Sequence, residues 1–492
     1  MRILFASSEA YPFVKTGGLA DVSASLPRAL AALGHDVVLL LPAYREALAV
    51  ALPLGIRVLQ ITEQDGQGVR LLETQLPGST VRVWLVDCPA FFDRAGNPYL
   101  DANGNPWGDN AARFALFCRI GASIARDACG LGWCPEVVHA NDWQTALLPL
   151  LLDEDTPAPA RVFTIHNLAY QGVFPEGEFR ALGLPRRYWH PEFLEFHGQL
   201  CLIKAGIVCA DRVTTVSPTY AREIRTPAFG CGLEGLLQHR AGVLHGILNG
   251  IDTDIWDPVR DAAISVPFDA DTLAGKRANT AALRAGMGLA AQSDAPLLGF
   301  IGRLVEQKGI DLITAVLPAL LREGAQCVLL GSGERHHEET LARLAAAHPG
   351  RVALRIGYDE ALAHRITAGA DIFLMPSRFE PCGLNQLYSL RYGTVPVVHA
   401  VGGLADTVED ASPAALAAGH ATGFVFGEPS AAAFAAALRR AITLRRVDPA
   451  AWQAMQQTGM RREVSWHTSA EAYVALYGDA LAAAHTRWHG GS

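Results

Sequence analysis

Residues 371–392 have the sequence DIFLMPSRFEPCGLNQLYSLRY, and this stretch decides the fold around it. Its first six residues form an apolar run that is typical of a buried parallel strand, and apolar residues with helical spacing begin at Leu387. Glu380 and Gly383 therefore lie where a strand ends and a helix begins. Backbone N–H groups at a helix start bind phosphate, and a carboxylate binds a sugar hydroxyl, so the turn suits a phosphate-linked sugar. An ordinary strand-to-helix turn with a capping Glu has the same local pattern.

The composition is that of a globular chain with two or more domains. The chain has 492 residues, of which 50% are hydrophobic and 18% charged, so each domain can bury a core. The net charge is −8 without a long basic run, which argues against nucleic-acid binding. We expect no membrane span, because no run of about 18 apolar residues occurs. The N-terminal segment 1–6 is too short for a secretory signal.

The cysteine and histidine residues predict neither disulfides nor a metal centre. The nine cysteines include no CxxC pair, and their odd number and wide spacing indicate reduced thiols in a cytoplasmic protein. Cys129 and Cys134 are weak candidates for metal ligands. The 16 histidines include no HExxH motif, and we interpret His336 and His337 as part of a solvated helix face.

The N-terminal region predicts a strand–loop–helix–strand unit. A strand at 2–6, a glycine loop at 11–18, a helix from Leu19 and a strand at 37–41 follow one another. The loop matches neither the dinucleotide motif GxGxxG nor a P-loop, since Lys15 precedes the glycines. A glycine turn of this kind lets the backbone approach a ligand closely, and the lysine can neutralise its charge. The alternative is a surface lysine beside a tight turn.

Two further polar turns follow predicted strands in the first half of the chain. The run VVHANDWQ at 137–144 places Asp142 after a strand, and the strand at 161–165 ends at His166. Because the carboxyl ends of parallel strands meet at one sheet edge, both residues can share a cleft with the loop of Lys15. A lone histidine is usually structural, but three polar strand ends together favour a site.

The second half resumes the alternation of strands and helices. Arg303 and Lys308 lie five residues apart in the turn after a strand at 297–301. An arginine fork and a lysine point charge can hold two adjacent phosphates. Their expected proximity to the Glu380 turn favours this role over a solvated helix start. Further strands are expected at 327–330, 352–356 and 395–399.

Residues 248–258, LNGIDTDIWDP, are the predicted connection between the domains. Asp252 and Asp254 form a DxD pattern, which in one class of sugar-transferring enzymes holds a divalent metal at a diphosphate. Here the pair lies in a turn at a linker, which favours a structural role. The sequence GGLAD occurs at 17–21 and at 402–406. The copies fall at different points of their strand–helix series, so we interpret them as two uses of one glycine turn.

Six motifs resemble those of bacterial glycogen synthases and plant starch synthases, glycosyltransferase family 5. In chain order they are KTGGLADV at 15–22, HANDWQ at 139–144, TIHNLAYQG at 164–172, NGIDTDIWDP at 249–258, GRLVEQKG at 302–309 and SRFEPCGLNQLYSLRYGTVP at 377–396. The resemblance implies the α/β GT-B architecture, in which two Rossmann-like, doubly wound domains face each other across a cleft. We expect an acceptor-side domain at 1–250, a nucleotide-sugar-binding domain at 251–465, and a C-terminal helix at about 466–492 that packs back on the first domain.

The resemblance implies retaining transfer of glucose from ADP-glucose to the non-reducing end of an α-1,4-glucan, which is the synthesis of glycogen or starch. The expected partners are ADP-glucose and the glucan, without nucleic acid, membrane, cofactor or metal. One alternative is another GT-B glucosyltransferase that uses UDP-glucose or acts on sucrose. The other is a non-catalytic glucan-binding protein, which would tolerate loss of Lys15, Arg303 and Lys308, whereas the enzyme would not.

The resemblance also implies roles for single residues. The implied catalytic residues are Arg303 and Lys308 at the diphosphate, Glu380 at the donor glucose, and His166 and Asp142 on the acceptor side. The implied binding residues are Lys15 and Gly18 in the first glycine loop, Cys382, Gly383 and Leu384 at the helix start, Tyr358 against adenine, and, with lesser roles, Asp21 and Asn249.

The chain lacks an obvious pair of carboxylates for a double displacement. Tyr388 stands where some related retaining transferases have a second Glu. We therefore expect transfer on one face of the sugar, in which the leaving phosphate helps to deprotonate the acceptor hydroxyl. Asn385 stands where bacterial relatives often have Thr, which predicts an altered phosphate or sugar contact. The segment from His399 to Val401 also departs from close relatives, with little expected consequence.

Overall fold

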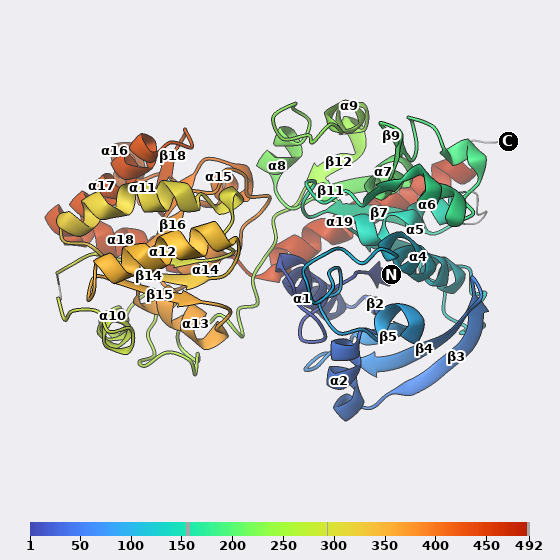
Figure 1. The fold of residues 1–492 in the computed structure, drawn as a ribbon, viewed down its shortest axis with the longest axis horizontal. Helices are drawn as coiled ribbons and strands as arrows, with labels where there is room; N and C mark the ends of the chain where they lie inside the picture. Colours follow the sequence, from blue (N-terminus) through green and yellow to red (C-terminus); the bar gives the residue numbers. More distant parts are fainter. Residues whose placement is uncertain (154–157, 293, 490–492) are drawn as a thin grey trace. The chain divides into compact units, whose positions relative to one another are not determined.

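The computed structural model describes residues 1–153, 158–292 and 294–489 (Figure 1). The chain divides into two compact units. Unit 1 comprises Met1–Asn249 and the C-terminal segment that begins at Trp466, and unit 2 comprises Gly250–Ser465. Among the residues that the structure describes, no helix has the length and apolar character needed to cross a bilayer.

Unit 1 is built on a nine-stranded sheet in the order β12-β11-β7-β6-β1-β2-β5-β4-β3. Neighbouring strands are parallel from β12 to β5. The chain runs from β1 to β2 and β5 on one side and returns to β6 and β7 on the other, so the switch point of this doubly wound sheet lies between β1 and β6. The parallel strands are β1 (Arg2–Ala6), β2 (Asp36–Pro42), β5 (Arg82–Asp87), β6 (Val137–Asn141), β7 (Ala160–Ile165), β11 (Arg212–Thr215) and β12 (Leu244–Gly246).

An antiparallel hairpin, which the sequence analysis did not predict, completes this sheet. It consists of β3 (Arg57–Gln64) and β4 (Gln67–Gln75), and β4 pairs with β5. The turn residues Asp65 and Gly66 have φ values of 53° and 71°. An Asp-Gly dipeptide favours this left-handed conformation at a two-residue hairpin turn, so the sequence contained a usable signal.

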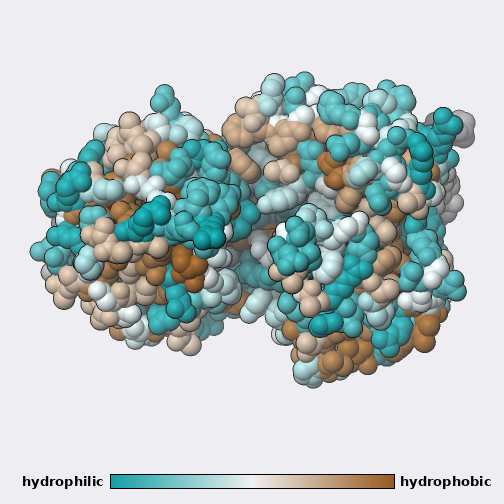
Figure 2. Space-filling view, viewed as in Figure 1, coloured by the Kyte–Doolittle hydropathy of each residue, from teal (hydrophilic) through white to brown (hydrophobic). Residues whose placement is uncertain are grey.

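The outer surface next to this hairpin carries exposed hydrophobic side chains. Figure 2 shows hydrophobic surface at the end of unit 1 where α2 (Arg45–Leu54) and β3 lie. Leu52 of α2 and Val58 and Ile61 of β3 are exposed there. The side chains belong to an edge strand and to the helix next to it, so they take no part in the core of the unit.

Two groups of helices pack against the parallel strands of unit 1. In one group α1 packs on α19 and β2, and in the other α5 packs on α4 and α7. The helices not yet given are α1 (Gly18–Ala32), α3 (Pro89–Phe92), α4 (Asn110–Ala125), α5 (Leu147–Leu151), α6 (Glu176–Ala181), α7 (Leu202–Cys209), α8 (Pro218–Glu223), α9 (Glu234–His239) and α19 (Trp466–His489). A small antiparallel sheet, also not predicted, joins β8 (Val173–Pro175), β10 (Gln199–Cys201) and β9 (Glu195–Phe196).

The C-terminal helix α19 is part of the core of unit 1. Tyr473 and Tyr477 are fully buried. The Tyr477 hydroxyl lies 2.8 Å from Nδ1 of His139 in β6, and Ser469 Oγ donates to the carbonyl of Leu248 at 2.6 Å. These polar contacts tie the last helix to the central strand β6 and to the segment after the edge strand β12.

Unit 2 is built on a six-stranded, fully parallel sheet in the order β15-β14-β13-β16-β17-β18. The strand order reverses between β13 and β16, so the switch point lies there. The strands are β13 (Leu297–Ile301), β14 (Gln326–Gly331), β15 (Val352–Ile356), β16 (Ile372–Met375), β17 (Val395–His399) and β18 (Phe424–Phe426). The strands predicted at 297–301, 352–356 and 395–399 have the predicted bounds.

The helices of unit 2 include one that the sequence analysis did not predict. This helix is α10 (Ala274–Gly286), which packs on α13. The others are α11 (Ile310–Arg322), α12 (Arg335–Ala347), α13 (Glu360–Gly369), α14 (Asn385–Arg391), α15 (Gly402–Thr407), α16 (Pro413–Ala418), α17 (Ala431–Val447) and α18 (Pro449–Met460). The predicted fold class is confirmed, because both units are doubly wound α/β sheets.

Candidate functional site

Glu380 and Lys308 form an ion pair at the switch point of unit 2. Lys308 Nζ donates to Glu380 Oε2 at 2.5 Å, and Ser377 Oγ donates to the same oxygen at 3.0 Å. Glu380 follows β16, and Lys308 ends a 3₁₀ turn, Glu306–Lys308, that follows β13. The exposed fractions of the lysine and glutamate side chains are 20% and 8%. The pair therefore places a fixed cation and a fixed carboxylate at the edge where doubly wound sheets bind ligands.

Arg303 is linked through Gln307 to the two turns that carry Lys308 and Glu380, which we call the corner of unit 2. Arg303 Nη2 donates to Gln307 Oε1 at 3.1 Å, and Gln307 Nε2 donates to the carbonyl of Phe379, also at 3.1 Å. The Arg303 side chain lies at the surface. The structure thus brings Arg303 into the same corner as Lys308 and Glu380.

Two glycines in left-handed conformations allow the turns at this corner to meet. Gly309 has φ 68°, and a Cβ on it would lie 2.2 Å from the carbonyl oxygen of Pro376. Gly383 has φ 71°, and a Cβ on it would lie 2.5 Å from Oε1 of Gln386. A side chain at either position would be strained and would clash. Leu384 follows as the N-cap residue of α14.

The second GGLAD sequence packs against the backbone of residues 380–382 and supports this corner. Gly402 and Gly403 begin α15, and Cβ atoms on them would lie 1.9 Å from the Glu380 carbonyl oxygen and 2.1 Å from the Cys382 carbonyl oxygen. Gly403 N donates to the Glu380 carbonyl at 3.2 Å. Cys382 is buried. The backbone of residues 380–382 is therefore held by a helix start that only glycine can form.

Three residues that the sequence analysis compared with related enzymes have structural contacts. Asn385 Nδ2 donates to the carbonyl of Ile301 at 2.8 Å, so its amide holds the end of β13. His399 Nδ1 lies 2.8 Å from the carbonyl oxygen of Ser377. The buried ring of Tyr388 stacks on Trp256 with a centroid separation of 3.7 Å, where it fills the core.

Tyr358 lies on the same carboxyl edge of the sheet, after β15. Its side chain is 76% exposed, which is unusual for a tyrosine in a folded domain. Its hydroxyl is hydrogen-bonded to Oε2 of Glu360. β15 is separated from β13 by one strand, so this ring lies on the flank of the corner formed by Lys308 and Glu380.

Asp142 and His166 lie together at the carboxyl edge of unit 1. Asp142 Oδ1 accepts a hydrogen bond from the backbone N–H of His166 at 2.8 Å, and His166 Nε2 lies 2.9 Å from Asn141 Oδ1. An amide oxygen only accepts, so this ring nitrogen is the donor. Asp142 has φ 59°, a conformation that a residue with a side chain adopts at an energetic cost and that is concentrated at functional sites.

Burial keeps both of these groups from carrying their usual charge. Burial raises the pKa of Asp142 from 3.8 to about 7, opposed by the N–H groups of His166 and Asn167 and assisted by the nearby Glu9 carboxylate. Burial also lowers the pKa of His166 from 6.5 to about 3. At neutral pH the imidazole is therefore uncharged, and the carboxyl is partly protonated.

Glu9 is a further residue of this edge that the sequence analysis missed. Its Oε2 accepts from Thr16 N at 2.5 Å and Gly17 N at 3.2 Å, and its Oε1 accepts from Thr16 Oγ1 at 2.6 Å and the Tyr99 hydroxyl at 2.5 Å. This one carboxylate holds the glycine loop that carries Lys15. Glu9 follows the first strand closely, so the search for polar residues after strands that singled out Asp142 was sufficient to find it.

The remaining predicted residues of unit 1 lie near this loop or after the last strand. Lys15 Nζ forms an ion pair with Asp21 Oδ1 at 2.9 Å, and both side chains are partly exposed. Gly18 begins α1. Asn249 follows β12 and is buried, and its Oδ1 lacks a hydrogen-bond partner among the described residues. Within the described ranges, no hydrogen bond or ion pair that the structure shows joins Asn249 to Asp142.

The two metal-related interpretations of the sequence have different outcomes. Asp252 Oδ1 accepts hydrogen bonds from the N–H groups of Asp254 and Ile255 at 3.0 and 3.3 Å, which supports the structural role of this turn. His336 is exposed, but His337 is buried, so the prediction of a solvated helix face is wrong for His337. His337 lies on the buried side of α12 together with Leu341, one turn further along the helix.

Comparisons with family models and solved structures show the class of protein to which this chain belongs. Residues 2–239 match the family described as starch synthase catalytic domain, and residues 288–457 match glycosyl transferases group 1. The solved catalytic domain of starch synthase IV from Arabidopsis thaliana, bound to ADP and acarbose, is 33% identical with a TM-score of 0.87, over 98% of this chain and 99% of that chain. Sucrose-phosphate synthase from Thermosynechococcus elongatus is 19% identical with a TM-score of 0.59 over the same shares, a likeness of fold alone. The chain thus has the GT-B fold of nucleotide-sugar glycosyltransferases.

Curated bacterial sequences narrow this class. Glycogen synthase 1 of Methylococcus capsulatus is 56% identical over 483 residues, which cover 98% of this chain and 97% of that protein. Glycogen synthase of Marinobacter nauticus is 55% identical over 98% of both chains. The chain therefore belongs to the glycogen synthase family, glycosyltransferase family 5, as its motifs predict.

Proposed function

We propose that this chain transfers glucose from ADP-glucose to the non-reducing end of an α-1,4-glucan with retention of the anomeric configuration. Its glycogen synthase relatives support the reaction, and the ADP bound to the related starch synthase supports an adenine nucleotide in the donor. The observation that carries the proposal is the Lys308–Glu380 pair with Arg303 beside it. This arrangement combines two cations for a diphosphate with a carboxylate for sugar hydroxyls.

In this proposal the carboxyl edge of unit 2 binds the donor. Arg303 and Lys308 hold the diphosphate, and the backbone N–H groups of Gly383 and Leu384 add to that hold. Lys308 is paired with Glu380, so a phosphate of the donor gives the lysine a second anionic partner and allows Glu380 to accept from hydroxyls of the donor glucose. The exposed ring of Tyr358 stacks on the adenine.

The carboxyl edge of unit 1 contributes the remaining groups. Lys15, held between the Glu9-bound loop and Asp21, adds positive charge for the donor, and Gly18 lets the backbone of this loop approach it. Asp142 and His166 bind hydroxyls of the reacting sugars on the acceptor side. Both are suited to this because they are buried, and because at neutral pH the imidazole is uncharged and the carboxyl is partly protonated, so they act as hydrogen-bonding partners.

The proposed reaction proceeds on one face of the donor sugar. The bond between C1 of glucose and the diphosphate oxygen breaks, and its electron pair leaves with ADP, stabilised by Arg303 and Lys308. The acceptor O4 then bonds to C1 on the same face, and its proton passes to an oxygen of the leaving phosphate. In this proposal the fixed cations make a resident metal or cofactor unnecessary.

A donor competition assay tests the proposal. Purified protein is given glycogen with either ADP-glucose or UDP-glucose, and the released nucleotide and the lengthened glucan are measured. We expect ADP release with chain extension from ADP-glucose and much less reaction with UDP-glucose. Preference for UDP-glucose would favour the other GT-B glucosyltransferases, and binding of glycogen without nucleotide release would favour a non-catalytic role.

We also propose a cytoplasmic location, supported by the thiols. All nine cysteines are free, and most are buried as ordinary apolar core residues. Free thiols persist in reducing compartments, where glutathione and thioredoxin are maintained. Fractionation of cells that contain the protein, with the recovered thiols titrated under denaturing conditions, checks this proposal.

A further inference from the structure

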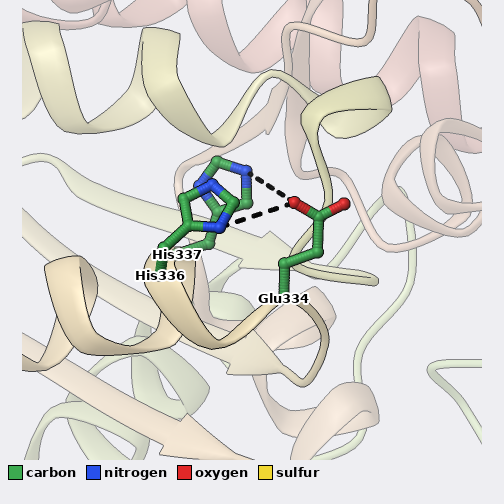
Figure 3. A group of neighbouring side chains, drawn as sticks. All are labelled: Glu334, His336 and His337. Carbon is green, nitrogen blue, oxygen red and sulfur yellow. Dashed lines mark ion pairs between the residues drawn. The ribbon is translucent and has the colours of Figure 1, made fainter. Parts of the chain in front are cut away.

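One carboxylate and two imidazoles converge where β14 is followed by α12 (Figure 3). Glu334 is the N-cap residue of α12, and His336 and His337 lie in its first turn. Glu334 Oε2 lies 3.6 Å from His336 Nδ1 and 3.7 Å from His337 Nε2. The ligand atoms of all three residues lie within 4.8 Å of one another. Figure 3 shows both rings directed toward the same carboxylate oxygen.

The buried member of this cluster lacks a hydrogen-bond partner. The His337 side chain is 9% exposed, and its Nε2 atom is buried and unsatisfied among the residues that the structure describes. A buried polar group that is left unpaired destabilises the folded state. Such a group in a native protein indicates a partner that protein atoms do not supply. His336, in contrast, is 68% exposed, so a solute can reach the cluster from one side.

Helix capping does not account for the position of Glu334. Its side chain makes no capping hydrogen bond to the N–H groups of α12. The preceding N–H of Gly333 is instead bound by Oε1 of Glu338 at 2.8 Å. The Glu334 carboxylate is directed at the two imidazoles, which it does not reach at hydrogen-bond distance.

The donor set is that of a transition metal. Imidazole nitrogens and a carboxylate oxygen suit Zn²⁺, Co²⁺ and Ni²⁺, whereas Mg²⁺ and Ca²⁺ prefer oxygen ligands alone. Zinc lies about 2.0–2.2 Å from such ligands, which places tetrahedral ligand atoms about 3.3 Å apart. The two separations of 3.6 and 3.7 Å need only a small side-chain movement to reach this value.

We propose that Glu334, His336 and His337 bind a divalent transition metal such as Zn²⁺ through three protein ligands. The fourth position is taken by water or by a small ligand, since His336 opens to solvent. The metal gives His337 Nε2 the partner that it lacks. None of the residues to which we assign a role in glucosyl transfer is a ligand of this site.

A bound metal would hold the turn that precedes α12. This turn packs on the loop after β13, because Glu334 N donates to the Leu304 carbonyl at 2.8 Å and Leu304 N donates to the Ser332 carbonyl at 2.9 Å. Leu304 is the neighbour of Arg303. The site therefore links the first turn of α12 to the backbone next to Arg303, which we propose to bind the diphosphate. The metal ligands themselves do not contact the diphosphate in this proposal.

Titration of the untagged full-length protein with Co²⁺, followed by visible absorption, tests the site. We expect one equivalent bound with the spectrum of nitrogen and oxygen ligands. We expect Glu334→Gln and His337→Gln each to weaken binding by at least about tenfold, the loss caused by disturbing even outer-shell partners of a metal ligand. His420→Gln, which changes an exposed histidine elsewhere in unit 2, should bind as the wild type does.

Two results would overturn the proposal. One is equal Co²⁺ affinity in the wild type and in both cluster variants. The other is the intense charge-transfer absorption of a thiolate ligand, which would place the ion at a cysteine such as the exposed Cys231. If His337→Gln does not fold, His336→Gln replaces it, because that side chain is exposed. As a second readout, Zn²⁺ should raise the thermal midpoint of the wild type and raise that of Glu334→Gln clearly less at the same Zn²⁺ concentration.

Discussion

The two units place different chemistry at the same topological position. In unit 1 the switch point between β1 and β6 holds Asp142, whose charge is suppressed by burial. In unit 2 the switch point between β13 and β16 holds the ion pair of Lys308 and Glu380, with Arg303 exposed beside it. A neutral hydroxyl is best bound by the first arrangement and a departing diphosphate by the second. One fold therefore serves both proposed tasks through the desolvation of its edge residues.

The two GGLAD sequences differ in the same instructive way. A Cβ on Gly17 would meet no described atom within 4 Å, and the residue has an extended φ of −157°. A Cβ on Gly402, the equivalent first glycine of the second copy, would lie 1.9 Å from the Glu380 carbonyl oxygen. Identical sequence thus leaves space beside the loop of unit 1 and fills it behind the corner of unit 2. The open copy is the one suited to a ligand, and the filled copy is the one suited to support.

The largest expected effect is the loss of the cation at the unit 2 switch point. Lys308→Ala should lower kcat by about 10²- to 10³-fold, the usual loss when one group that stabilises developing negative charge is removed. Nucleotide release from ADP-glucose in the presence of glycogen gives the measurement. The fold should persist, because Ser377 still donates to Glu380.

Arg439→Ala is the matched control for this loss. It also removes a cation from unit 2, but one whose ion pair with Glu323 is about half exposed on both sides, so kcat should not change. Near-normal turnover of Lys308→Ala would contradict the proposal that the charged edge of unit 2 stabilises the departing diphosphate.

The next effect concerns stability and separates the two glycine sequences. Gly402→Ala should lower the free energy of unfolding by about 1–3 kcal/mol, as is typical of overpacking, because the new methyl group meets the Glu380 carbonyl. Gly17→Ala adds the same atom where space is open and should change stability by less than about 0.5 kcal/mol. Urea unfolding of both variants gives the comparison, and equal losses would show that the two copies are packed alike.

The third effect is a pH dependence specific to the buried acid of unit 1. Burial raises the pKa of Asp142 from 3.8 to about 7, so the folded protein keeps a proton that the unfolded chain loses between these values. The carboxyl therefore lowers stability as pH rises through this window, by at most about 1.4 kcal/mol per pH unit. Asp142→Asn can still accept from His166 N and should gain stability relative to the wild type as pH rises from about 4 to 7.

His166→Gln should change the pH dependence of stability in the opposite direction from Asp142→Asn. Burial lowers the pKa of His166 from 6.5 to about 3, so the folded protein binds fewer protons than the unfolded chain between these values. The contribution of this group to the free energy of unfolding therefore rises with pH from about 3 to 6.5. The variant lacks this contribution, so its stability relative to the wild type should fall as pH rises through that window. Unfolding free energies measured at several pH values decide. Parallel curves for wild type and both variants would contradict the desolvated state of this edge.

The sequence predicted those features of the two sheet edges that depend on neighbouring residues in the chain. It did not predict those that depend on contacts between distant residues. Apolar runs located β13 and β16, so the positions of Arg303 and Glu380 at strand ends followed from pattern alone. The pairing of Lys308 with Glu380 joins residues 72 positions apart, and no periodicity encodes such a contact. The suppressed charge of Asp142 was equally hidden, because it follows from burial by residues of many elements.

Some features were missed although the sequence contained a local signal. Glu9 follows the first strand, as Asp142 follows a later one, but it stands outside the motifs that carried the resemblance. The hairpin of β3 and β4 was signalled by Asp65-Gly66. His337 had no such signal, because which side of α12 turns inward is set by tertiary packing.

The smallest expected effect lies on the flank of the unit 2 edge and tests how far the site extends. Tyr358→Ala should raise the KM for ADP-glucose with kcat nearly unchanged, because an aromatic ring stacked on a base contributes about 1–3 kcal/mol and this ring is 76% exposed. Tyr358→Phe keeps the ring and loses only the hydroxyl that contacts Glu360, so its KM should remain near that of the wild type. Steady-state kinetics with varied ADP-glucose distinguishes the two. If the phenylalanine variant were impaired as much as the alanine variant, the hydroxyl rather than stacking would be responsible, and the donor-binding edge would end at β13.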